Sequence, residues 1–514
     1  MRRTNISWSI ASIVVIIILI LFRNVQLSVN HPQRSVIEAD VLHYYAYLPA
    51  LLVYNDLNLD FVAKAPGKFS DRFWPVTAPN GKYVIMTTMG MSIMYSPFVV
   101  PTHYFLKFTG NKAEGYSLPY IWALIFSSVF YILISLILLR RMLKPLYSEK
   151  TIAATLLIVI LGTNIIHYIT REAAFSHAYS FFLIVWLIYI VDKYYKKPSA
   201  GNALLVGFIS GLITLVRPTN AVALILIPLW SIGSLSDLRE RLMLIFKNWH
   251  HLILLMFTLI LTWVPQIIYW KMTSGQYFFN GYGDGGRFFF GNPQIINILF
   301  SYRKGWLLYT PSMILAIAGF VWLYKSNKPY FYPILIFFVI NTWVLASWWL
   351  WWFGGSYGNR AFIDMYGLLA FPLAAFIQRI TTHVHWSLKS LSWALFLLFI
   401  VHNLFQLQQY HNGAIHYASM TKEAYWDSFG NLKPSPDFYK LVSFPDYEAA
   451  KKGIYPKPVI KVPEKTEKTI EFYEKQLRSN PKMIKILEEK AILENITLDS
   501  MIKRDAIWLY NNKK

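Results

Sequence analysis

The chain has 514 residues, of which 55% are hydrophobic and 17% aromatic, and its formal net charge is +22. A soluble globular protein is nearer 45–50% apolar, and here the excess falls in blocks of roughly 17–22 residues, enough to cross about 30 Å of hydrocarbon. The cations sit in short clusters between these blocks, which argues against nucleic-acid binding and favours anchoring at a negatively charged membrane face. With no cysteine, a disulfide framework and a thiolate metal site are excluded, as in many bacterial envelope proteins.

The N-terminal segment "MRRTNISWSIASIVVIIILILFRN" has the charged start and apolar run of a signal peptide. No small-x-small cleavage site follows the run, because "RNVQLSVNHPQRS" is too bulky and polar to supply one. We therefore expect a retained first span, with Arg2 and Arg3 on the cytoplasmic side.

Further apolar blocks predict about eleven spans in total and an all-α polytopic membrane protein. After the first span, the blocks lie near 118–139, 151–169, 178–191, 203–215, 221–232, 251–269, 307–324, 331–349, 362–377 and 391–407. Alternate loops are rich in lysine and arginine, and all of them fall inside if the N-terminus is inside. No repeat of 20–50 residues is visible.

This threading divides the chain into a transmembrane domain, residues 1–409, and a polar C-terminal region, residues 410–514. It makes residues 24–117 a large first external loop, and it places the C-terminal region outside as well. In that region "NPKMIKILEEKAILENI" has an Asn-Pro helix start, so we expect a partly helical tail. The predicted location is a bacterial cytoplasmic membrane, with the site facing the exterior.

Charged and polar residues near a bilayer are costly, so their positions are informative. In this topology they gather at the outer ends of spans, which predicts one outward-facing site. Its candidate substrate-binding residues are Tyr44, Tyr45, His177, Arg217, Arg287, Arg303, Lys304, Tyr357 and Arg360. A transporter would place such groups near the midplane, on broken helices in repeated halves.

Two acids, Glu38 and Asp40, lie in "VIEADVLHYYAYLPALLVYNDL", directly after the first span. If a helix begins near Asp40, then Asp40, His43, Tyr44 and Tyr47 share one face, and the adjoining apolar face suits a helix lying along the membrane surface. One alternative makes Asp40 only a helix N-cap. The other makes it a base that takes a proton from an acceptor hydroxyl.

The cations also have alternative interpretations. Arg217 precedes a proline at a span end and could simply extend its charge to the interface. Arg287 follows the glycine-rich "GYGDGG", which suits either close approach to a ligand or an ordinary turn. His177 is as well suited to bonding backbone or water as to a functional role. No second ligand at diagnostic spacing accompanies His43, so the sequence indicates no metal site and no certain cofactor, although a divalent cation is not excluded.

Five stretches in order along the chain resemble the GT-C superfamily of integral-membrane glycosyltransferases. They are "EADVLHYYAYLPALLVYNDL", "SHAYSFF", "LVRPTN", "SYRKGWLLYTP" and "WWFGGSYGNRAF". The chain is most similar to the bacterial branch near protein O-mannosyltransferases and aminoarabinose transferases. The resemblance covers roughly residues 1–410 and implies a GT-C-like bundle whose first external loop carries interfacial helices.

The resemblance implies inverting transfer of a sugar from a polyprenyl-phosphate donor to a hydroxyl of a glycolipid, polysaccharide or protein, as part of glycan biosynthesis in the cell envelope. It implies an acid in the first external loop as general base. Asp40 matches that aspartate best, and Glu38 is a partner or substitute, because Val41 stands where the branch often has glutamate. Fixed cations would stabilise the leaving phosphate, with Arg360 and Arg217 ranked first. The alternatives are an O-antigen ligase or polymerase, and a flippase or transporter of lipid-linked sugars.

Overall fold

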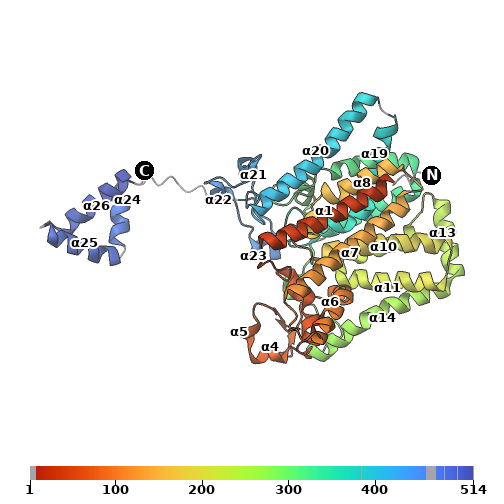
Figure 1. Ribbon diagram of the computed structural model, residues 1–514, viewed down its shortest axis with the longest axis horizontal. Helices are drawn as coiled ribbons and strands as arrows, with labels where there is room; N and C mark the ends of the chain where they lie inside the picture. The colour runs from red at the N-terminus through yellow and green to blue at the C-terminus, as the bar shows by residue number, and fades with distance from the viewer. Residues whose placement is uncertain (1–6, 384, 459–469, 480, 495, 513–514) are drawn as a thin grey trace.

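The computed structural model describes residues 7–383, 385–458, 470–479, 481–494 and 496–512. Most of these residues are helical and very few are in strands (Figure 1), which confirms the predicted all-α class. Seven described helices are long and apolar enough to cross a membrane, and three shorter apolar segments accompany them. The seven are Trp8–Asn30, Leu118–Leu143, Ser176–Lys196, Trp249–Ser274, Lys328–Ser347, Arg360–Thr382 and Trp386–His411, and the three are Ala200–Val216, Pro218–Leu229 and Met313–Ser326.

The first third of the chain contains three long helices together with several shorter elements and one small hairpin. Its helices are α1 (Trp8–Asn30), α2 (Asp40–Tyr45), α3 (Tyr47–Leu52), α4 (Asp60–Lys64), α5 (Pro66–Phe69), α6 (Gly90–Phe108), α7 (Leu118–Leu143), α8 (Glu149–Leu161) and α9 (Ile165–Tyr168). The strands β1 (Val76–Thr77) and β2 (Tyr83–Val84) pair antiparallel, with Val76 opposite Val84.

The middle of the chain supplies most of the bundle, and three of its elements, marked η, are 3-10 helices. Its elements are α10 (Ser176–Lys196), α11 (Ala200–Val216), η1 (Pro218–Ile225), α12 (Leu226–Leu229), α13 (Leu235–Lys247), α14 (Trp249–Ser274), η2 (Gly283–Gly285), α15 (Ile295–Phe300), α16 (Trp306–Tyr309), α17 (Met313–Ser326), α18 (Lys328–Ser347), η3 (Arg360–Met365), α19 (Tyr366–His383) and α20 (Trp386–His411).

The C-terminal region carries short helices and then a separate helical unit. The short helices are α21 (Lys422–Ser428), α22 (Phe438–Leu441) and α23 (Tyr447–Lys451), and the unit is α24 (Ile470–Arg478), α25 (Pro481–Leu493) and α26 (Leu498–Asn512). The unit has its own small core, which includes Tyr473, Leu487 and Ile502. Figure 1 shows it apart from the bundle, and α25 begins at the predicted Asn-Pro helix start.

The bundle is held by close helix contacts. The helices α11 and α14 lie side by side, and Gly207 and Gly211 of α11 face α14. A side chain at Gly207 would meet the carbonyl of Leu255, and one at Gly211 would meet Thr262. This small-xxx-small spacing lets two helix backbones approach where lipid offers no hydrophobic driving force between helices.

The segment 24–117, which the sequence predicts to be the first external loop, differs from the expectation in two respects. Residues 90–108 form the 19-residue helix α6, which packs on α7 and α11. The apolar face that begins at Val41 does not lie along a membrane surface, because Val41 and Tyr45 are buried and α2 packs against α6. The loop is therefore built into the protein core, and this fixes the position of Asp40.

Candidate active site

Asp40 is the first residue of α2 and follows a strained residue. Ala39 occupies the N-cap position with φ 48° and ψ −126°, in the left-handed region that costs a residue with a Cβ of order 1–3 kcal/mol. No side chain caps this helix end, so the interpretation of Asp40 as an N-cap is wrong. The Asp40 side chain is 41% exposed, so its carboxylate can be reached by a substrate.

Arg360 pairs directly with Asp40. Its Nη2 lies 2.7 Å from Asp40 Oδ2, and its guanidinium carbon lies 5.2 Å from the centre of the Phe175 ring. Its Nε is buried without a hydrogen-bond partner among the described residues. Burial raises the pKa of Asp40, but the charge and hydrogen bond of Arg360 lower it more, so this carboxyl ionises below its usual range.

A buried carboxylate, Asp364, organises a second group of polar side chains beside this pair. Asp364 lies four residues after Arg360 on η3 and is 3% exposed. Its Oδ1 lies 2.9 Å from His177 Nδ1, and its Oδ2 accepts a hydrogen bond of 3.0 Å from Asn220 Nδ2. The same Oδ2 lies 3.3 Å from Arg217 Nε. Asp364 therefore holds side chains from α10, η1 and the end of α11 in one place.

Arg217 joins the Asp364 group to α2. Its Nη1 lies 3.4 Å from Ser176 Oγ and 3.2 Å from His177 Nε2. Ser176 Oγ donates in turn to the Tyr44 hydroxyl at 3.5 Å. Asp40 and Tyr44 share α2, and Arg360 and Asp364 share η3, so these two elements connect the ion pair to the Asp364 group. Five of the predicted residues thus lie in one connected cluster: Asp40, Tyr44, His177, Arg217 and Arg360.

Sequence reasoning missed Tyr282, which lies in the glycine-rich loop that follows α14. Burial and the negative charge of Asp40 raise the pKa of this phenol, while Arg217 and Arg360 lower it, so Tyr282 lies within electrostatic range of the cluster. Arg287 of the same loop is exposed, and its carbonyl accepts a 3.1 Å hydrogen bond from Trp349 N. An aromatic residue among glycines was the available signal for Tyr282.

Two further predicted residues near α2 are not part of the connected cluster. Glu38 is exposed, and partial burial together with the charge of Glu172 raises the pKa of its carboxyl. Tyr45 points into the core, where its hydroxyl donates to the carbonyl of Gly115 at 2.6 Å. The two carboxyls of this stretch are thus set apart: Asp40 ionises more readily than usual, and Glu38 less readily.

Arg303, Lys304 and Tyr357 bond to carbonyl groups of the backbone. Arg303 Nη1 donates to the Ala418 carbonyl at 3.0 Å, and Lys304 Nζ donates to the Ser356 carbonyl. The Tyr357 hydroxyl donates to the Asn403 carbonyl at 3.2 Å. Lys304 is 1% exposed, and its burial lowers the pKa of the amine well below its usual value. Lys304 and Tyr357 therefore fix the loop that precedes Arg360.

Glu172 is a further acid near the cluster. Its Oε1 lies 3.3 Å from His167 Nε2, and its other oxygen, Oε2, is buried without a hydrogen-bond partner among the described residues. Burial raises the pKa of Glu172, but His167 lowers it more, so the carboxyl ionises below its usual range. Within the described ranges, no three His, Asp or Glu side chains converge as a set of metal ligands.

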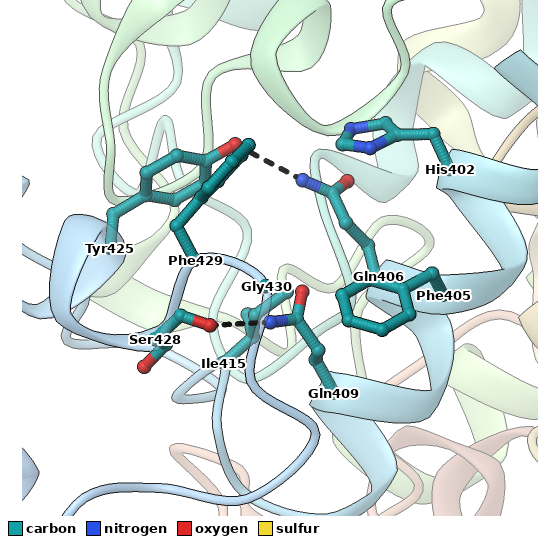
Figure 2. Close-up of a pocket in the computed structure, with 9 residues that line it drawn as sticks. All are labelled: His402, Phe405, Gln406, Gln409, Ile415, Tyr425, Ser428, Phe429 and Gly430. Carbon is teal, nitrogen blue, oxygen red and sulfur yellow. Dashed lines mark hydrogen bonds between the residues drawn. The ribbon is translucent and has the colours of Figure 1, made fainter. Parts of the chain in front are cut away.

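A separate recess of about 400 Å³ lies between the C-terminal end of α20 and the segment that carries α21 (Figure 2), and none of the predicted site residues lines it. Gln406 Nε2 donates to the Tyr425 hydroxyl at 3.2 Å, and Gln409 Nε2 donates to the Ser428 carbonyl at 2.7 Å. These bonds fasten the segment after α20 to the bundle.

Comparison with known proteins found no matching family model and no matching curated protein. Among solved structures, the chain is similar to the archaeal oligosaccharyltransferase AglB from Archaeoglobus fulgidus in complex with an inhibitory peptide and a dolichol-phosphate. The TM-score is 0.45 and the sequence identity 12%, and the match covers 89% of this chain and 61% of that one. The chain is also similar to the apo form of the Archaeoglobus fulgidus oligosaccharyltransferase, with a TM-score of 0.45, 11% identity, and coverage of 90% and 62%. This chain therefore spans about three fifths of the length of those proteins. At this level of likeness we draw nothing about activity from these matches.

Proposed function

We propose that the protein is a membrane glycosyltransferase that moves a sugar from a polyprenyl-phosphate donor to a hydroxyl acceptor, with inversion at the anomeric carbon. The observation that carries the proposal is the pairing of the accessible Asp40 carboxylate with Arg360, next to the buried Asp364–His177–Arg217 group. Such a transfer needs a base at the acceptor hydroxyl and positive charge at the leaving phosphate, and these residues supply a carboxylate and two guanidinium groups.

In the proposed reaction, Asp40 accepts the proton of the acceptor hydroxyl as that oxygen forms its bond to the anomeric carbon. The bond from that carbon to the phosphate oxygen breaks, and the lipid phosphate leaves with the electron pair. Arg360 and Arg217 stabilise this leaving group, because fixed cations bind the growing negative charge more strongly than the ground state. Arg360 Nε is buried without a hydrogen-bond partner among the described residues, whereas Arg217 Nε already lies 3.3 Å from Asp364 Oδ2.

The ion pair of Asp40 with Arg360 suggests an order of events. Before the donor binds, Arg360 holds the pKa of Asp40 low, and a carboxylate of low pKa is a weak base. A donor phosphate bound to Arg360 would offset its positive charge and add a negative charge near Asp40. Both effects raise the pKa of Asp40, so we propose that donor binding makes the base stronger.

Asp364 acts as a positioning residue in this proposal. It is buried, and its two oxygens contact His177, Arg217 and Asn220. It would hold Arg217 in one orientation, so that the guanidinium needs little reorganisation when charge develops on the phosphate.

The test uses purified protein in detergent micelles with a synthetic polyprenyl-phosphate sugar and a hydroxyl acceptor. The expected result is a new glycosidic bond of inverted configuration by NMR, with release of one lipid phosphate per bond. A flippase or transporter would leave the sugar–phosphate bond intact, and an O-antigen ligase or polymerase would use a diphosphate-linked glycan in place of the monophosphate donor. Neither of those outcomes is compatible with the proposal.

A further inference from the structure

An apolar pocket lies at the end of the bundle far from Asp40. The empty space in it is about 450 Å³, part of which is open to the exterior, and it is lined mainly by side chains of α10, α11, α13 and α14, including Val191, Ala203, Val206, Ile245 and Leu255. Helix α10 connects the two ends, because His177 lies near its beginning and Tyr195 near its end. At a rise of about 1.5 Å per residue, these two positions are roughly 27 Å apart, and Figure 1 shows α13 at that far end.

A buried arginine contacts one of the residues that line this pocket. Arg241 of α13 is 9% exposed, and its guanidinium carbon lies 3.2 Å from the centre of the ring of Tyr195, which lines the pocket. Its Nη1 is buried and has no hydrogen-bond partner among the described residues. The pKa of Asp237, four residues earlier, is lowered mainly by the 2.8 Å hydrogen bond that its Oδ2 accepts from Gly233 N, and less by the charge of Arg241. Arg241 therefore retains a donor for an anionic group.

The surroundings of Arg241 are cationic and adjoin lipid-exposed surface. The segments 192–200 and 235–247 contain six lysine or arginine residues against three acids. The outer face of α13 is apolar, with Met243 55% exposed and Phe246 77% exposed. A helix with an exposed apolar face and a cationic environment is typical of the boundary between lipid tails and anionic headgroups.

We propose that this pocket binds an anionic phospholipid, with one acyl chain among Val206, Ile245 and Leu255 and the phosphate on Arg241. The apolar lining suits the chain, and a guanidinium binds phosphate through paired donors. The polar Tyr194–His251 pair, joined by a 3.1 Å contact, also lines the pocket and can bond the headgroup or glycerol oxygens. The site is independent of the proposed sugar transfer.

Native mass spectrometry of the full-length protein in detergent tests the proposal. The probes are phosphatidylglycerol and phosphatidylcholine with identical acyl chains, each titrated separately. We expect one phosphatidylglycerol to be retained with a preference of about tenfold or more over phosphatidylcholine. Both lipids carry the phosphate, but the choline cation of phosphatidylcholine offsets the negative charge of its phosphate beside Arg241. Equal retention of the two lipids would overturn the proposal.

Two variants on the same helix provide a matched pair. Arg241→Gln should lose the preference for phosphatidylglycerol, while Arg239→Gln, which removes an exposed arginine of α13, should keep it. Unchanged preference in Arg241→Gln, or equal loss in both variants, would contradict the site. If Arg241→Gln does not fold, Arg241→Lys decides, because it keeps the charge and loses the paired donors, and an undiminished preference in that variant also contradicts the site.

The acyl chain and the source of the phosphate are tested separately. Ala203→Leu adds side-chain volume inside the pocket and should reduce retention of phosphatidylglycerol while leaving Arg241 in place; unchanged retention would mean that no chain enters the pocket. Polyprenyl phosphate should compete poorly for this site. If it displaces phosphatidylglycerol at equal concentration, the ligand is a polyprenyl phosphate and the assignment to a phospholipid is wrong.

Discussion

Replacement of Arg360 tests how the base and the leaving-group cation depend on each other. Arg360→Lys keeps a positive charge beside Asp40 but loses the planar fork that can hold two phosphate oxygens. One hydrogen bond to a charged group contributes about 1.5–3 kcal/mol, so its loss in the transition state should lower kcat by roughly 10- to 150-fold. Arg360→Gln removes the charge as well, and its kcat should fall further.

The two variants should also differ in pH dependence. In the wild type, Arg360 offsets the burial that would raise the pKa of Asp40. Arg360→Gln leaves the burial and removes the offset, so the pKa of Asp40 should rise. The acid limb of the kcat/KM profile should then move to higher pH, because Asp40 becomes protonated earlier as the pH falls. Arg360→Lys should shift this limb much less.

The assay measures initial rates of sugar transfer in micelles between pH 4 and pH 9, with thermal unfolding of each variant as the folding control. Wild-type turnover in Arg360→Lys would show that the fork holds no phosphate. An unmoved acid limb in Arg360→Gln would show that Asp40 is not the group whose ionisation the profile reports. Either result refutes the coupling.

Substitutions at three other residues separate positioning from structure. Asp364→Ala should cost about 3–5 kcal/mol in the free energy of unfolding, because it leaves Arg217, whose side chain is 16% exposed, without its carboxylate partner. Asp364→Asn should cost less and still lose turnover. Thermal unfolding and kcat measured in parallel check this, and a fully active Asp364→Ala contradicts it. Arg217→Lys should fold and insert normally but transfer sugar poorly, with the defect in kcat and not in acceptor KM; normal kinetics would leave Arg217 as a cation that only extends to the interface. Lys304→Met should lower the free energy of unfolding by about 1–3 kcal/mol, because the bond to the Ser356 carbonyl is lost. The variant should keep most of its turnover below the unfolding temperature. A stable but inactive Lys304→Met protein would instead support a role of Lys304 in donor binding.

The convergence of Asp40, His177, Arg217 and Arg360 could be predicted from the sequence. Polar residues at the ends of apolar blocks are excluded from hydrocarbon, and the alternation of cationic loops put these four on one side of the membrane. The positions of the apolar blocks and of the charged residues were therefore enough to predict which residues gather at the site. These positions did not predict which individual side chains pair with one another.

The role of Asp364 and the helix α6 depend on tertiary contacts that no local sequence pattern predicts. Asp364 stands inside an apolar run that reads as a span, and only the fold shows that His177, Arg217 and Asn220 satisfy its charge. Helix α6 carries Pro97 and Pro101 in its interior, so residues 90–108 read as loop.

Lys304 is a residue whose burial the sequence does not predict, because a lysine beside an arginine in a predicted loop is expected to be exposed. In the fold its amine is buried and bonded to the backbone. Burial of a charged side chain is decided by tertiary packing, which spacing along the sequence does not report.

The claim that Asp40 is the general base is tested most directly by comparing Asp40→Asn with Glu38→Gln in single-turnover sugar transfer at saturating donor. Asparagine keeps the shape of the side chain but cannot take the proton, so Asp40→Asn should lower the rate by roughly 10²–10⁴-fold with donor binding little changed. Glu38→Gln should remain active, because Glu38 is exposed and lies outside the cluster. A near-normal rate in Asp40→Asn together with an inactive Glu38→Gln would move the base to Glu38, and full activity in both would contradict the catalytic role of this stretch.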